Sequence, residues 1–245
     1  MPENKVILVN NLVKKFGSFT ANDNLSFEVY EGEIFGFLGA NGAGKTTALR
    51  ILSGLLEPTS GEVTVAGYDV RKNSERIKLN IGYMCQKFSL YEDLTVSENI
   101  ILYGGIYGLD NKSIRERKDK LLHRLRFEEY ENRLIADLPL GLKQKLAFSV
   151  AILHDPRIVF LDEPTGGVDP VTRRQFWEMI WETASGGITI FVTTHYMDEA
   201  EYCDRVSIMS EGRIVAIDTP ENLKKQYNAH SVEEVFVKIA RPSKN

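Results

Sequence analysis

The sequence lacks the features that mark secreted, membrane-spanning or nucleic-acid-binding chains. It contains two cysteines, too few for a disulfide framework, and this scarcity is typical of a reducing compartment. The longest apolar-leaning run, residues 100–109, contains three glycines and is far too short to span a bilayer. Residues 1–5 carry no apolar region of a signal peptide. The net charge of −4 gives no strong attraction to nucleic acid or to an anionic membrane. We therefore expect a soluble protein that only a partner could hold at a membrane.

Strand and helix patterns alternate along the chain, which predicts an α/β fold with a parallel sheet. Hydrophobic residues make up 43% of the 245 residues, which excludes a disordered chain and suffices for one large domain or two small ones. Strands are expected at 6–9, 25–29, 34–38, 61–67, 81–85, 158–161 and 188–192, with a hairpin formed by 206–208 and 213–217. Helices are expected at 47–52, 142–154 and 176–183, a charged helical insertion at 111–135, and one helix with a loose end after residue 221.

Residues 39–46 read Gly-Ala-Asn-Gly-Ala-Gly-Lys-Thr, the P-loop pattern. A run of backbone N–H groups and the N-terminus of the following helix can face an anion there. Lys45 supplies a mobile charge for β- and γ-phosphates, and the hydroxyl of Thr46 suits a Mg²⁺ ligand. A glycine-rich turn before an ordinary helix is the alternative, but an apolar strand precedes this loop and a helix follows it. The predicted phosphate-binding residues are Gly39, Asn41, Gly42, Ala43, Gly44, Lys45, Thr46 and Thr47.

A second motif follows the apolar run at 158–161, where a strand ends in Asp162 and Glu163. Two acids in a surface turn are common by themselves. Beside a P-loop, however, this is the Walker B arrangement. We expect Asp162 to hold Mg²⁺, directly or through water, and Glu163 to orient and deprotonate the attacking water.

Gln86 and His195 each follow a predicted strand. A glutamine at the end of a strand can reach both Mg²⁺ and the attacking water, and an imidazole can hydrogen-bond a γ-phosphate oxygen. Taken alone, the glutamine is more often an ordinary loop residue and the histidine more often structural.

The order of these motifs over about residues 5–220 resembles that of the ATP-binding-cassette (ABC) ATPases. The resemblance implies ATP and Mg²⁺ as ligands and functional roles for Gln86 and His195. It also implies that Phe16 stacks on adenine, although a core residue near a turn is the alternative. Residues 166–169 match the segment that crosses the dimer interface in this family, ending at Asp169.

The resemblance further implies a P-loop NTPase core with a parallel sheet, an N-terminal antiparallel β-subdomain and a helical insertion. We expect one cassette over residues 1–220, with its helical subdomain at about 87–155, and a C-terminal helix and tail over 221–245.

One segment departs from the family pattern. The usual signature is Leu-Ser-Gly-Gly-x-x-Gln, whereas residues 138–144 read Leu-Pro-Leu-Gly-Leu-Lys-Gln. In the family this segment completes the ATP site of the opposite subunit. Pro139 offers neither a hydroxyl nor an N–H, and Leu140 adds bulk, while Gly141 and the helix N-terminus are retained. We expect the fold to be unaffected and the ATP site that this chain completes on its partner to be weakened.

As a family member, the chain is expected to be the ATP-hydrolysing subunit of a transporter. Its expected partners are a second cassette, in a homodimer or a heterodimer, and separate integral membrane permease subunits, with no nucleic acid. Residues 88–95 and the variant signature resemble those of ABC-2-type exporters, including multidrug-efflux systems. The expected location is cytoplasmic, on the inner face of the cell membrane through the permease.

Three other functions are weighed against transport. Ribosome-associated ABC ATPases resemble two cassettes in one chain, whereas this sequence shows one cassette. DNA-repair or chromosome ATPases carry a coiled coil far longer than residues 111–135. A non-catalytic ATP sensor is disfavoured by Glu163 and His195.

Phe88, Leu90 and Tyr91 either form a docking surface for the membrane subunit or pack against the helical subdomain.

Overall fold

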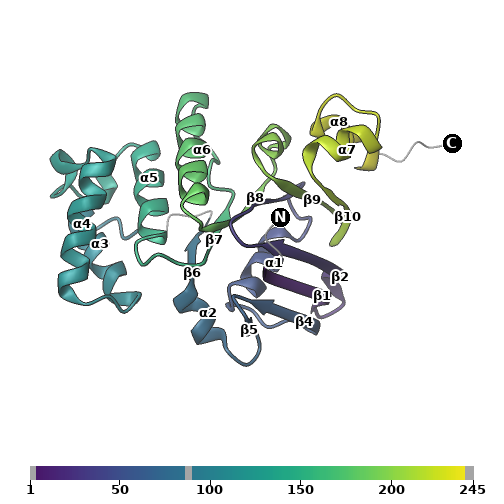
Figure 1. Ribbon diagram of the computed structural model, residues 1–245, viewed down its shortest axis with the longest axis horizontal. Helices are drawn as coiled ribbons and strands as arrows, with labels where there is room; N and C mark the ends of the chain where they lie inside the picture. The colour runs from purple at the N-terminus through teal and green to yellow at the C-terminus, as the bar shows by residue number, and fades with distance from the viewer. Residues whose placement is uncertain (1–3, 86–89, 241–245) are drawn as a thin grey trace.

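The computed structural model describes residues 4–85 and 90–240, apart from the side chain of residue 240. Two sheets and a group of helices set apart from them make up the architecture (Figure 1). The expected α/β fold with a parallel sheet and an N-terminal antiparallel sheet is confirmed. In the part of the chain that is described, no helix is both long and apolar enough to cross a bilayer.

The larger sheet has six strands in the order β10-β9-β3-β8-β7-β6. Their bounds are β3 Ile34–Gly39, β6 Ile81–Met84, β7 Ile158–Asp162, β8 Thr189–Thr194, β9 Arg205–Ser210 and β10 Arg213–Asp218. Neighbours pair in parallel from β6 through β7, β8 and β3 to β9, and only β10 is antiparallel. Every residue of β3, β7 and β8 is buried, which explains their continuous apolar sequences. Because parallel strands end at one edge of the sheet, the segments that follow β3, β7 and β8 come together there.

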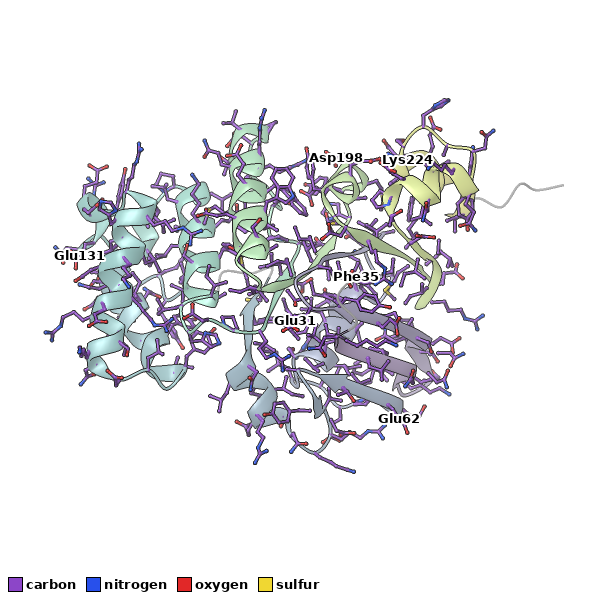
Figure 2. All side chains as sticks on the ribbon, in the orientation of Figure 1. Glu31, Phe35, Glu62, Glu131, Asp198 and Lys224 are labelled. Atoms are coloured by element: carbon purple, nitrogen blue, oxygen red, sulfur yellow. The ribbon has the colours of Figure 1, made fainter. Side chains whose placement is uncertain are left out.

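The smaller sheet is antiparallel, in the order β2-β1-β4-β5. Its strands are β1 Lys5–Phe16, β2 Phe19–Tyr30, β4 Ser60–Val65 and β5 Tyr68–Asp69. Aromatic rings from both sheets meet in one core, with Phe27 of β2 against Phe35 and Phe37 of β3 and Phe191 of β8. Figure 2 labels Phe35 at this place in the interior. The ring contacts tie the hairpin of β1 and β2 to the strand that leads into the P-loop.

Several helices surround the two sheets. Their bounds are α1 Lys45–Leu52, α2 Ser74–Asn80, α3 Val96–Ile106, α4 Asn111–Leu125, α5 Leu140–Ala151, α6 Pro170–Ser185, α7 Pro220–Gln226 and α8 Val232–Ala240, with short 3₁₀ helices η1 Glu128–Tyr130, η2 Ile135–Asp137 and η3 Met197–Tyr202. Helices α3, α4 and α5 form a separate group at the left of Figure 1. The sequence patterns did not predict α2 or α3. The signal for α3 is a capping box, in which the hydroxyl of Thr95 accepts from the N–H of Glu98 and the Glu98 carboxylate accepts from the N–H of Thr95.

The C-terminal region corrects one expectation. Two helices, α7 and α8, are present where one helix was expected after residue 221, and residues 241–245 lie outside the described residues. Leu223, Val232 and Val235 are buried in the core cluster, and α8 packs against η3. Lys224, labelled in Figure 2, pairs with Glu201 of η3 at 2.6 Å. Apolar side chains at helical spacing in α8 explain why this segment packs on the domain.

Candidate active site

The P-loop connects β3 to α1 through a tight turn. Gly44 adopts a φ of +100°, and a Cβ there would lie 2.3 Å from the carbonyl oxygen of Ala21. Asn22, on β2, donates its side-chain N–H to the carbonyl of Gly44 at 3.0 Å. Gly39 and Ala43, within the loop, are buried. The strand of the small sheet therefore holds the loop in place, a role of Asn22 that sequence reasoning missed.

Lys45 begins α1 and is 4% exposed. Its Nζ donates to the carbonyl oxygens of Gly39 and Ala40 at 2.7 and 3.2 Å, and it lies 3.3 Å from Oε1 of Glu163. The ammonium is thus held over the loop, between backbone oxygens and the carboxylate at the end of β7. A positive charge in this position can bind phosphate oxygens at the mouth of the loop.

Asp162 lies at the end of β7 and accepts two hydroxyl hydrogen bonds at Oδ1. Thr193 of β8 donates at 2.6 Å and Thr46 of α1 donates at 3.2 Å. Burial raises the pKa of Asp162 above its ordinary value, although the two hydroxyl groups oppose this shift. The hydroxyl of Thr46 and the carboxylate of Asp162 are hard oxygen donors, the kind that Mg²⁺ takes from a protein when phosphate oxygens supply the remainder. Thr193 was missed from the sequence because nothing local distinguishes it from other strand residues.

Glu163 and His195 meet where β7 and β8 end. Nδ1 of His195 lies 3.0 Å from Oε2 of Glu163, so the ring N–H donates to the carboxylate. Glu163 has a φ of +49°, in the left-handed region, and its backbone N–H donates to the carbonyl and the hydroxyl of Thr193, both at 3.1 Å. These two bonds hold a backbone conformation that is unfavourable for a glutamate. The predicted base and the predicted histidine therefore form one unit.

A pocket of about 390 Å³ opens over the P-loop. It is lined by Phe19, Ala21, Asn41, Gly42, Gly44, Lys45, Thr46, Thr47 and Glu163. Phe19, at the start of β2, supplies the aromatic group of this lining. Phe16, predicted to stack on adenine, pairs with Phe19 across the hairpin turn and is 50% exposed. Its role stays a prediction, and Phe19 joins it as a second aromatic candidate.

A second pocket, of about 290 Å³, lies on the other side of Glu163. Its lining includes His195, Cys85, Leu140 and Gln144. The side chain of Gln144 is buried and donates to the carbonyl of Gly166 at 3.4 Å. Gln86, predicted as a catalytic residue and a Mg²⁺ ligand, lies outside the described residues, and its role stays a prediction.

The variant signature and the predicted interface segment line a third pocket, of about 360 Å³. Helix α5 starts at Leu140, and Pro139 occupies the cap position without a side-chain hydrogen bond. Asp169 caps α6, and the hydroxyl and N–H of Thr172 hold the pKa of Asp169 below its ordinary value. Gly141 packs closely on α6, since a Cβ there would lie 2.7 Å from Cγ2 of Thr172. Neither Gly141 nor Asp169 lines the pocket over this chain's own P-loop.

Leu90 and Tyr91, two of the residues considered for a docking surface, differ in how far they are buried. Leu90 is 5% exposed and belongs to the core cluster, so of the two alternatives packing holds for Leu90 and docking does not. Tyr91 is 50% exposed, and its backbone N–H donates to the side-chain oxygen of Asn99 at 2.9 Å. Phe88 lies outside the described residues. Of this group, Tyr91 is the described residue that keeps an exposed side chain.

Comparison with known proteins agrees with this geometry. A family profile described as ABC transporter matches residues 22–166, more than half of the chain. The chain belongs to the ABC transporter family. Its domain is an ABC ATPase domain, which confirms the resemblance read from the motif order.

Two curated relatives are similar over nearly the whole chain. One is described as a probable multidrug ABC transporter ATP-binding protein, YbhF of Escherichia coli (strain K12), 46% identical over 92% of this chain and 39% of that protein. The chain thus spans about two fifths of that relative's length. The other is the linearmycin resistance ATP-binding protein LnrL of Bacillus subtilis (strain 168), 34% identical over 95% of this chain and 75% of that protein.

A solved structure is also similar. It is the ATP-binding cassette MJ0796, in a dimeric post-hydrolysis state bound to ADP and Pi. The TM-score is 0.78 at 25% identity, and the match covers 87% of this chain and 98% of that chain.

Proposed function

We propose that the chain binds and hydrolyses ATP and thereby drives transport through separate membrane subunits. The observation that carries the proposal is the position of Glu163 between Lys45, at 3.3 Å, and His195, at 3.0 Å. An ammonium suited to bind phosphate, a carboxylate suited to act as a base and a histidine hydrogen-bonded to that carboxylate lie together at one edge of the sheet, which supports the proposal. Such an arrangement is suited to phosphoryl transfer to water, which needs bound phosphates and an oriented attacking water.

In the proposed reaction, the P-loop N–H groups and Lys45 bind the phosphates, and Glu163 accepts a proton from the attacking water. The water oxygen bonds to the γ-phosphorus as the bond to the leaving ADP oxygen breaks. His195 holds the carboxylate of Glu163 in place through its Nδ1–H. Thr46 and Asp162 would hold Mg²⁺, which neutralises charge on the phosphates when bound. Gln86 is proposed as a further contact to Mg²⁺ and the attacking water.

We propose a second cassette as a partner, because Gly141 and Asp169 line a pocket separate from this chain's own P-loop. In a head-to-tail dimer they would face the ATP of the opposite subunit. The dimeric state of MJ0796 supports such an arrangement. We favour a homodimer, in which Gly141 and the N-terminus of α5 suffice to complete the site.

Export is the proposed direction of transport. The printed descriptions of the relatives, multidrug transport for YbhF and linearmycin resistance for LnrL, support this. The proposed location is the inner face of the cell membrane, where the chain would be held by permease subunits. We propose residues 1–220 as the cassette, with α3, α4 and α5 as its helical subdomain within about 87–155.

The test is phosphate release from ATP by the purified full chain in the presence of Mg²⁺. We expect Glu163→Gln to lower turnover by about 10²–10⁴-fold, because the general base is lost. Glu178→Gln is the matched control, since Glu178 lies on the exposed face of α6 and pairs with Arg174. Turnover of the Glu163 variant equal to that of the Glu178 variant would refute the assignment of the base.

The transport half of the proposal needs its own experiment. The genes beside that of this chain would first be searched for a multi-span membrane protein. A protein found in this way would be co-expressed with the chain, and the two reconstituted in proteoliposomes. We expect the pair to co-purify and the membrane protein to change the rate of ATP hydrolysis. A chain that hydrolyses ATP but neither binds the membrane protein nor responds to it would refute the transporter assignment.

A further inference from the structure

Glu199 is a fully buried carboxylate in η3, four residues after His195. Its Oε1 accepts a hydrogen bond from the hydroxyl of Thr165 at 2.5 Å. Among the described residues, its Oε2 has no hydrogen-bond partner. Burying a carboxyl group with one oxygen left without a hydrogen bond is unfavourable, so the packing of η3 alone does not account for a glutamate at this position.

Thr165 connects this carboxylate to the segment that carries the proposed base. It is 1% exposed and lies two residues after Glu163. The segment between them is a tight turn, because the N–H of Gly166 donates to the carbonyl of Glu163 at 3.1 Å. The Thr165–Glu199 hydrogen bond therefore fixes the loop after β7 to the loop after β8.

Arg173 of α6 also contacts the carboxylate of Glu199. Its Nε lies 3.7 Å from Oε1 of Glu199, and its guanidinium carbon lies 4.2 Å from the centre of the Tyr196 ring. The Tyr196 ring in turn lies 4.2 Å from the ring of His195, centre to centre. Arg173 thus forms an ion pair with the buried carboxylate, without a hydrogen bond from Nε, and lies over the ring of the aromatic residue beside the histidine.

These contacts close a ring around the proposed catalytic pair. From Glu163 the ring runs through the backbone to Thr165, then to Glu199, Arg173, Tyr196 and His195, and returns to Glu163 through the 3.0 Å hydrogen bond. Glu163 and His195 come from loops after different strands. The ring supplies a connection between these loops in addition to the direct contact of the two side chains.

We propose that Thr165 and Glu199 are positioning residues that hold Glu163 and His195 in the geometry needed for ATP hydrolysis. This inference rests on the proposed function. Small displacements of a base from its attack geometry reduce turnover strongly, by up to about 10²-fold per ångström. The ring meets the P-loop site only through Glu163, whose carboxylate lies 3.3 Å from Lys45, so loss of the Thr165–Glu199 hydrogen bond should act mainly on the chemical step and change nucleotide binding little.

The test uses Thr165→Val, which removes the hydroxyl and keeps the shape of the side chain. Thr183→Val is the matched control, because Thr183 is also buried, at 5% exposure, and donates its hydroxyl to the carbonyl of Met179 at 2.8 Å. We expect Thr165→Val to lower kcat about tenfold with KM for ATP within about twofold. Thr165→Ser, which keeps the hydroxyl, should restore kcat, and Thr183→Val should leave kcat within about twofold.

A double-mutant cycle with His195→Ala separates positioning from a general loss of stability. If Thr165 acts through the pair, Thr165→Val should reduce kcat by less than about twofold when His195 is already removed. The same tenfold loss in that background would overturn the proposal. So would an unchanged kcat for Thr165→Val, or an equal loss for Thr183→Val.

A separate readout distinguishes failure of this inference from failure of the proposed function. A wild-type chain that releases no phosphate from ATP would refute the proposed function. Whether or not the chain releases phosphate, amide hydrogen exchange over residues 194–202 reports directly on the Thr165–Glu199 connection between the two loops. We expect exchange there to increase in Thr165→Val and not in Thr183→Val, and equal exchange in the two variants would refute the ring.

Discussion

Nζ of Lys45 lies 3.3 Å from Oε1 of Glu163, and both side chains are almost excluded from solvent. The same carboxylate receives the Nδ1–H of His195 through its other oxygen. Glu163 therefore competes with phosphate oxygens for Lys45 while it is held in place as the proposed base. The Glu163 side chain therefore affects both ATP binding and ATP hydrolysis, and substitutions of Lys45 and Glu163 can separate the two effects.

Lys45→Ala should weaken ATP binding strongly, since it removes charge-assisted hydrogen bonds of roughly 1.5–3 kcal/mol each. Glu163→Gln should keep or increase ATP affinity, because it removes a negative charge beside the phosphates. Titration with a fluorescent ATP analogue measures both, with Lys112→Ala, at an exposed lysine of α4, as the control. Unchanged affinity in Lys45→Ala would contradict the P-loop assignment.

Phe19 and Phe16 are the two candidates for stacking on adenine, and the two assignments lead to opposite predictions. Phe19 lines the pocket over the P-loop, whereas Phe16 lies across the hairpin turn with Nζ of Lys14 5.1 Å from its ring centre. If Phe19 stacks on adenine, Phe19→Ala should weaken ATP binding by about 0.5–1.5 kcal/mol and Phe16→Ala should have little effect. Equilibrium titration of the two variants decides between them, because each serves as the control for the other.

Asp162 should make stability depend on pH. Its pKa is raised by burial above the ordinary value of 3.8, so the folded chain takes up this proton at a higher pH than the unfolded chain does. The contribution of Asp162 to stability is therefore least favourable at neutral pH and improves as the pH falls through the raised pKa. Without nucleotide, Asp162→Asn should raise Tm at pH 7, and this advantage should shrink as the pH falls.

The same variant tests the metal assignment. Asp162→Asn should abolish the effect of Mg²⁺ on ATP binding while binding of ATP without Mg²⁺ persists. Thermal melting across pH and ATP titration with and without Mg²⁺ are the measurements. A Tm difference that grows on acidification would mean that burial does not dominate at Asp162.

The signature segment should respond to restoration of the usual family residues. Pro139 caps α5 without a side-chain hydrogen bond, so Pro139→Ser should stabilise the fold by about 1 kcal/mol through a new cap. Leu140 is 39% exposed and crowds the pocket that would face the partner's ATP. The double substitution Pro139→Ser and Leu140→Gly should strengthen ATP-driven dimerisation and turnover, measured by gel filtration and phosphate release. If neither changes, the variant signature is not a weak point.

Much of the site was predictable because its motifs are local and a parallel sheet assembles them. The P-loop, Asp162-Glu163 and His195 each follow a buried apolar strand, and β3, β7 and β8 end at the same edge. Recognising each strand and the residue after it was therefore enough to place Lys45, Glu163 and His195 together. The strands predicted from apolar runs are present, with shifted ends.

Other features were decided by contacts between segments far apart in the chain. Helix α8 packs on η3, where the sequence predicted one helix and a loose end, and Leu90 is buried, which the sequence left open. Sequence periodicity shows which face of a helix is apolar but not what covers it. That is why the sequence predicted one helix and a loose end for the C-terminal region, and left open whether Leu90 docks a partner or packs against the helical subdomain.

The amino-acid sequence by itself determined the family, the P-loop and the candidate site residues at the strand ends, because glycine, lysine and carboxylate at fixed local spacing have few other uses. Only the tertiary structure decided that Phe19 lines the pocket and that Thr165 meets Glu199, 34 residues further along. A hydrogen bond between two loops depends on the relative position of β7 and β8 in the sheet. Nothing in the residues near Thr165 or Glu199 encodes that distance.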